Sequence, residues 1–167
     1  PNENDGKIYE ISLQQGVNLL ANPGFELDAN GDNRPDSWTS NAEFTRSNVT
    51  PHGGSYVGKH FATDNGDYTI SQTVNNLTAG TVYSFKGWVN IPPTSDTFTF
   101  KLQVKWRNSS NSTISTDTIK TYKAATNGWN QVTFSKAAPA GTTNAQVIMK
   151  PGNLNATIYV DDFEFGP

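Results

Sequence analysis

The stretch that decides the fold reads Thr81-Val-Tyr-Ser-Phe-Lys-Gly-Trp-Val-Asn-Ile91. Apolar and polar residues alternate along it, and a period of two is typical of a strand that buries one face. The apolar face holds Tyr83, Phe85, Gly87, Val89 and Ile91. Trp88 breaks this pattern, because its indole falls on the polar face beside Lys86 and Asn90.

Two more stretches combine a buried face with an unusual polar face. In residues 97–107 the polar face carries Thr99, Lys101, Gln103, Lys105 and Arg107, and in residues 129–134 it carries Trp129, Gln131 and Thr133. If these strands lie in one sheet, its exposed face presents indoles beside amides and long cations. Aromatic rings stack on the apolar faces of pyranose rings, and amides both donate to and accept from hydroxyls. The pattern therefore predicts a sugar-binding surface made of Trp88, Trp129, Gln103 and Gln131.

The rest of the chain predicts an all-β domain. The 167 residues suffice for one core, and the contents of hydrophobic (34%) and charged residues (16%) are both low. No run of ten residues has helical periodicity, and turn signals such as Asn65-Gly66 and Asn127-Gly128 recur. Further strands are expected at 43–47, 56–62, 67–74, 113–122, 144–150 and 156–165, with a weak first strand at 8–13. We expect a linker end at 1–7 and a single antiparallel β-sandwich, a jelly roll, at 8–167.

Charge and composition exclude several classes of partner. The net charge is −3 and no basic run exists, so nucleic acid and anionic membranes are poor candidates. No apolar segment is long enough to span a bilayer. Cysteine is absent, which excludes disulfides and thiolate chemistry. We expect a monomeric, secreted domain without its signal peptide, in which a metal ion supplies rigidity.

The order of landmarks resembles the β-sandwich carbohydrate-binding modules appended to bacterial polysaccharide hydrolases. The landmarks are Asn18-Leu-Leu-Ala-Asn-Pro-Gly-Phe-Glu26, Trp38, His52-Gly-Gly-Ser-Tyr56, Ile70-Ser-Gln-Thr-Val74, Leu77 to Val89, Gly128-Trp-Asn-Gln-Val-Thr-Phe134 and Ile158-Tyr-Val-Asp-Asp-Phe163. They are specific as an ordered set, and they resemble the group of families 4, 9, 16 and 22, above all family 16. The resemblance implies binding of β-1,4-linked chains such as cellulose, mannan or xylan in a groove on a concave sheet. It also implies an attached glycoside hydrolase.

Several candidate residues have two interpretations. A register slip of one residue would bury Trp88 and Trp129, but it would also bury Lys86 and Asn90, so the exposed position is favoured. Trp38 either forms a platform at one end of the groove or plugs the end of the sandwich. Lys101 and Lys105 either hydrogen-bond sugar hydroxyls or keep the face soluble.

Two acidic groups are candidate calcium ligands. Asp28, Asn30, Asp32 and Asp36 have the alternate spacing of calcium loops, but a solvated acidic turn has the same composition. The family resemblance implies a structural calcium held by Glu26 with Asp161 or Asp162. A carboxylate within the apolar strand around Asp161 needs a cation or donors to offset its burial. The two groups could form one site or two.

The sequence does not predict an active site. Glycosidases need two carboxylates about 5–9.5 Å apart across a cleft. The segment 81–107 carries only Asp96, in a turn, and no Gly-x-Ser-x-Gly motif or histidine cluster is present. We therefore expect a non-catalytic module. The alternatives are a jelly-roll lyase or hydrolase and a protein-binding adhesin domain, which would need a wider apolar patch.

Overall fold

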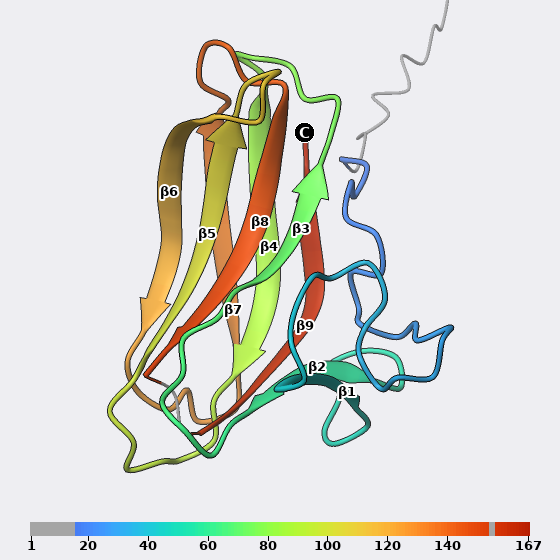
Figure 1. Ribbon diagram of the computed structural model, residues 1–167, viewed down its shortest axis with the longest axis vertical. Helices are drawn as coiled ribbons and strands as arrows, with labels where there is room; N and C mark the ends of the chain where they lie inside the picture. Colours follow the sequence, from blue (N-terminus) through green and yellow to red (C-terminus); the bar gives the residue numbers. More distant parts are fainter. Residues whose placement is uncertain (1–15, 154–155) are drawn as a thin grey trace, which may run out of the picture.

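Two antiparallel sheets pack face to face in the computed structural model, which describes residues 16–153 and 156–167 (Figure 1). The expected linker end at 1–7 and first strand at 8–13 lie outside the described residues. The described part contains no helix long and apolar enough to cross a membrane. Its strands confirm the prediction of an all-β jelly roll.

In the described part of the chain, nine strands make up the two sheets. The five-stranded sheet has the order β1 (Phe44–Ser47), β2 (Val57–Phe61), β9 (Thr157–Gly166), β4 (Val82–Asn90) and β7 (Trp129–Ala137). The four-stranded sheet has the order β3 (Ile70–Val74), β8 (Asn144–Gly152), β5 (Thr99–Arg107) and β6 (Thr113–Tyr122). Figure 1 shows β6, β5, β8 and β3 side by side, with β7, β4 and β9 in the second layer. All of the pairs within both sheets are antiparallel.

The predicted faces of β4 and β5 are confirmed. Tyr83, Phe85 and Val89 of β4 are buried, whereas Trp88 is half-exposed on the opposite side. In β5 the buried residues are Phe100, Leu102, Val104 and Trp106. The core thus lies between the two sheets, and hydrophobic burial fixes which side of each strand faces outward.

The two strands do not share a sheet, however. β4 pairs with β7 and β9, and β5 pairs with β6 and β8. The expectation that Gln103 lies beside Trp88 is therefore wrong. The segment that connects β4 to β5 contains Pro92 and Pro93, which lack the N–H groups of a strand ladder. Along this segment the chain passes from one sheet to the other.

Candidate functional site

The outward side of β4, β7 and β9 brings together three of the predicted residues. Trp88 lies directly opposite Gln131 of β7, and Asn90 lies opposite Trp129. On its other side β4 pairs with β9, where Tyr159 lies opposite Asn90. Both indoles are half-exposed. We call this surface the Trp88 face.

A histidine that the sequence did not single out completes an aromatic cluster on this face. The loop between β1 and β2 stacks His52 on Trp88, with 4.1 Å between ring centroids and 23° between planes. The same imidazole meets Trp129 edge-on, at 5.6 Å and 72°. We call Trp88, Trp129 and His52 the aromatic patch. Because His52 covers part of Trp88, the aromatic patch presents three rings together.

Two carboxylates of β9 fix the loop that carries His52. The β4–β9 register shifts between Lys86 and Trp88, and Asp162 has a φ of 49°, which is the geometry of a bulge. Asp162 Oδ2 lies 2.6 Å from His52 Nδ1. Asp161 Oδ2 accepts hydrogen bonds from the His52 and Gly53 amides, at 2.9 and 3.0 Å. A Cβ at Gly53 would lie 2.6 Å from Asp162 Oδ2, so a side chain there would displace the Asp162 carboxylate from His52.

Asp161 is fully buried, and burial opposes ionisation of its carboxyl group. Burial raises the pKa of Asp161 to about 6, and the neighbouring charge of Asp162 acts in the same direction. The amides of His52, Gly53 and Asp162 oppose this shift because they stabilise the carboxylate. Asp161 is therefore a buried acid that holds the loop through backbone donors.

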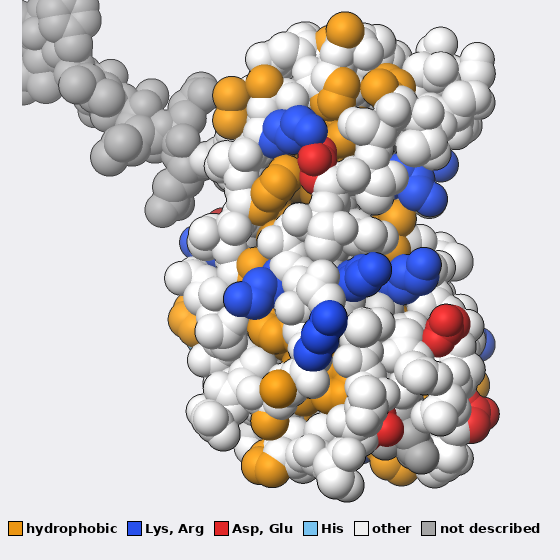
Figure 2. Space-filling view, turned by 90° about the vertical axis from the view of Figure 1, so that its left-hand side faces the viewer, with side chains coloured by type: hydrophobic (Ala, Val, Ile, Leu, Met, Phe, Trp, Pro, Cys, Tyr) orange, Lys and Arg blue, Asp and Glu red, His pale blue; other side chains and the backbone are white. Residues whose placement is uncertain are grey.

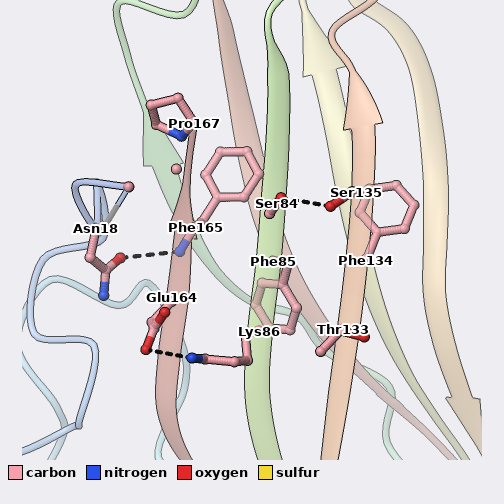
Figure 3. Close-up of a pocket in the computed structure, with 12 residues that line it drawn as sticks. Asn18, Ser84, Phe85, Lys86, Thr133, Phe134, Ser135, Glu164, Phe165 and Pro167 are labelled. Atoms are coloured by element: carbon pink, nitrogen blue, oxygen red, sulfur yellow. Dashed lines mark hydrogen bonds and ion pairs between the residues drawn. The ribbon is translucent and has the colours of Figure 1, made fainter. Parts of the chain in front are cut away.

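A pocket with polar and apolar walls continues the Trp88 face along β4 (Figure 3). Its volume is about 360 Å³, and its polar lining includes Ser84, Lys86, Thr133, Ser135 and Glu164. Figure 3 shows Lys86 pointing toward Glu164 of β9, 3.2 Å apart, and Ser84 toward Ser135 of β7, 2.6 Å apart. Lys86 lies two residues from Trp88 on the same face. Hydroxyls and an ion pair thus adjoin the aromatic patch.

The remaining predicted sugar ligands lie elsewhere. Lys101, Gln103 and Lys105 point outward from β5, on the far side of the sandwich. Trp38 is only 6% exposed and packs against Phe25 and Phe163, at 5.2 and 6.0 Å between centroids. Its indole N–H donates to the Asn22 carbonyl at 3.1 Å. Trp38 therefore plugs the core, and the platform interpretation is wrong.

In the acidic loop of residues 28–36, backbone amides donate hydrogen bonds to an aspartate of the same loop. Asp28 accepts hydrogen bonds from the amides of Gly31, Asp32 and Asn33, and Arg46 lies 3.7 Å from its carboxylate. The Asn30 side-chain amide donates to Asp32. These contacts are those expected of an acidic turn, and calcium binding by Asp28 and Asn30 stays a prediction.

Glu26 belongs with Asp161 and Asp162 instead. Its Oε1 accepts hydrogen bonds from the Ser55 and Tyr56 amides, at 2.9 and 3.2 Å, so it holds the same loop as the two aspartates. A Cβ built on Gly24 would lie 3.8 and 3.9 Å from the Oδ1 atoms of Asp162 and Asp161. Within residues 16–153 and 156–167, no three histidine or acidic side chains are grouped as metal ligands.

The fold is shared with known sugar-binding domains. No protein-family model and no curated protein sequence matches the chain. A structure described as family 16 carbohydrate-binding module-2 superposes with a TM-score of 0.67 and 15% identity, over 90% of this chain and 100% of that one. TmCBM61 in complex with β-1,4-galactotriose gives a TM-score of 0.66 and 15% identity, over 89% and 97%.

A longer protein contains a similar domain. The enzymatically active domain of tailspike protein 4 from bacteriophage CBA120 superposes with a TM-score of 0.70 and 16% identity over 90% of this chain. The chain spans only 21% of that protein's length. The superpositions establish the shared fold, but at identities this low they do not single out family 16. The domain described here has the β-sandwich fold of the carbohydrate-binding modules.

Proposed function

We propose that this domain is a non-catalytic carbohydrate binder that holds β-1,4-linked chains, such as cellulose, glucomannan or mannan, on the Trp88 face. The observation that carries the proposal is the gathering of two half-exposed indoles and Gln131 on neighbouring strands. The rings offer stacking surfaces, and Gln131 and the hydroxyls of the adjacent pocket offer hydrogen bonds to sugar hydroxyls. The fold shared with carbohydrate-binding modules supports the same conclusion.

A protein partner is less well supported. Protein interfaces are built around a contiguous apolar centre. Among the described residues, the large exposed hydrophobic side chains come from separate loops and strands, including Val49, Phe61, Val82 and Ile114. The aromatic patch is bordered by amides, hydroxyls and an ion pair instead. This mixture suits a hydroxylated ligand.

The carboxylates on the Trp88 face are engaged. The sequence pattern placed no acid beside the groove apart from Asp96, but β9 brings Asp162 and Glu164 onto this face. Asp162 contacts His52, and Glu164 contacts Lys86. Asp161 is fully buried and accepts hydrogen bonds from the loop that carries His52. We infer that these groups position the loop and the pocket wall. We propose that the domain acts outside the cell as a monomer and brings a covalently attached glycoside hydrolase to its substrate.

Affinity electrophoresis against soluble glucomannan, hydroxyethylcellulose and xylan tests the proposed function. We expect retardation with micromolar affinity, about −7 to −8 kcal/mol. Gln131→Ala should weaken binding by about fivefold, because its hydrogen bonds largely replace bonds to water and contribute about 1 kcal/mol. Gln103→Ala is the matched control, and it should bind neutral polysaccharides like the parent.

Absence of retardation by all three polysaccharides would refute sugar binding on this face. Equal losses from Gln103→Ala and Gln131→Ala would refute the placement of the site. Reducing ends that accumulate with the polysaccharide, and that disappear in Glu164→Gln, would show that the domain is an enzyme.

We also propose a structural calcium ion held by Glu26, Asp161 and Asp162. These carboxylates do not form a metal cluster in the described residues, and the support is that all three contact the loop that carries His52. Calcium prefers carboxylate and carbonyl oxygens, and it would offset the cost of ionising the buried Asp161. The ion would fix the loop and would not contact sugar.

Removal of calcium should lower the melting temperature. A ligand that binds only the folded state stabilises it by RT ln(1 + [L]/Kd), which is about 2.7 kcal/mol at a hundredfold excess over Kd. Differential scanning calorimetry in calcium and in EDTA measures the difference. In Asp161→Asn, which keeps an acceptor for the loop amides, the two curves should coincide. If the parent melts identically in calcium and in EDTA, the ion is absent.

A further inference from the structure

The outward side of β5 and β8 is cationic. Lys101, Lys105 and Arg107 point outward at alternate positions of β5, and Lys150 does so from β8. We call these four residues the cationic face. Figure 2, which faces the β6 edge of the sandwich, shows Lys and Arg side chains in a band across the middle of that edge. This concentration is unexpected in a chain whose net charge is −3.

Among the described residues, the carboxylate at the end of this sheet is that of Asp67, which accepts a hydrogen bond from the Asn153 amide at 2.8 Å and forms no ion pair with the four cations. The other outward positions of the four strands are uncharged: Ser71, Thr73, Thr99, Gln103, Thr113, Thr116, Thr118, Thr121, Asn144, Gln146 and Ile148. Among the described residues, Lys101, Lys105 and Lys150 have no acidic group within ion-pair distance, in contrast to Lys86 and Lys136, which are paired.

Two of these cations oppose each other directly. Lys101 and Lys150 are cross-strand partners. Like charges at such positions repel and destabilise a sheet. The face therefore carries an electrostatic cost that the folded domain does not offset by itself, and that an anionic ligand would relieve.

The geometry suits an extended ligand. Alternate residues of a strand are about 7 Å apart, so the row from Lys101 to Arg107 spans about 20 Å. Arg107 extends the row sideways, because its Nε donates to Asn144 of β8 at 2.7 Å and its Nη2 donates to Thr73 of β3 at 3.2 Å. A single small anion would reach only a part of this row.

We propose that the cationic face binds an acidic polysaccharide, a chain that carries carboxylate or sulfate groups on its sugars. This site is separate from the Trp88 face and does not depend on it. Lysine and arginine would pair with the anionic groups, while Gln103, Gln146 and the threonines of β6 would meet hydroxyls. The outward positions of these strands hold no aromatic ring on which nucleic-acid bases could stack.

Affinity electrophoresis with polygalacturonate and carrageenan tests the proposal and separates carboxylate from sulfate ligands. We expect retardation by at least one of them in about 0.1 M NaCl. Retardation should be lost in about 1 M NaCl, where the Debye length falls from about 10 Å to about 3 Å. Lys101→Gln and Lys105→Gln should each weaken binding about two- to fivefold, as expected for exposed ion pairs.

Lys59→Gln is the matched control. It removes the same charge from β2, in the other sheet, and should leave binding of the acidic polysaccharide unchanged. Trp88→Ala should also retain acidic binding even if it loses glucomannan, so this site and the proposed function can fail separately. Without ligand, Lys101→Gln should melt no lower than the parent, because it removes the repulsion with Lys150.

Three outcomes would overturn the proposal. The first is an absence of retardation by both polyanions at low salt. The second is an equal loss in Lys59→Gln and in the two β5 variants, which would indicate a net-charge effect. The third is that duplex DNA, at an equal concentration of anionic groups, binds at least as tightly as either polysaccharide. That result would make the partner a nucleic acid.

Discussion

Trp88→Ala and Trp129→Ala are each expected to weaken binding of glucomannan at least tenfold. An aromatic anchor at the centre of a binding surface contributes about 2 kcal/mol or more, which corresponds to more than a tenfold change in Kd. Both rings belong to the aromatic patch and are half-exposed, so their loss removes stacking surface rather than core. Isothermal titration calorimetry with a soluble oligosaccharide measures the change.

The two variants should differ in stability. Trp129→Ala should melt close to the parent. Trp88→Ala should melt a few degrees lower, because His52 loses its stacked partner and such a pair contributes about 0.5–1.5 kcal/mol. Trp129→Phe, which keeps an aromatic ring, is the matched control and should retain most of the affinity. Undiminished binding by both alanine variants would show that the ligand lies elsewhere.

The Trp38→Ala variant, by contrast, should have a lower free energy of unfolding than the parent. Replacing a buried tryptophan with alanine costs about 3–5 kcal/mol, since it leaves a cavity as well as losing apolar burial. Trp38 packs against Phe25 and Phe163, and its N–H donates to the Asn22 carbonyl. At about 2–4 °C per kcal/mol for a domain of this size, the melting temperature should fall by roughly 6–20 °C.

Denaturant unfolding and binding should be measured on the same Trp38→Ala sample. Well below its melting temperature, the variant should bind glucomannan like the parent, because the ring is not on the Trp88 face. Trp38→Phe, which fills most of the space, should lose less stability. A variant that melts like the parent but no longer binds would restore the platform interpretation.

Alternation predicted the faces of the strands because burial acts on each strand separately. In β4 the polar side chains Ser84, Lys86 and Asn90 can face outward only if Trp88 does the same. The same alternation holds in β5, where Trp106 lies between the outward Lys105 and Arg107, is buried in the core and donates its N–H to Asp117 at 2.7 Å. Strand boundaries were also close, and the segment expected at 113–122 is the observed β6.

The neighbours of each strand could not be read from the same pattern. The alternation of apolar and polar residues shows which side of β5 carries Gln103. It does not show that β5 and the strand of Trp88 belong to different sheets. His52 reaches Trp88 only because β9 pairs with both β2 and β4, with residues far apart in the sequence. The bulge at Asp162, which turns two adjacent carboxylates toward the His52 loop, depends on that pairing too.

The position of β9 between β2 and β4 has a consequence for biosynthesis. Until residues 157–166 have left the ribosome, the five-stranded sheet consists of two separate ribbons, β1–β2 and β4–β7, each with an unpaired edge. Such edges can pair with another nascent chain. At about 5–20 residues per second, several seconds separate the emergence of β4 from that of β9. The loop with His52 has no aspartates to hold it during that interval, so the aromatic patch is among the last parts of the domain to form.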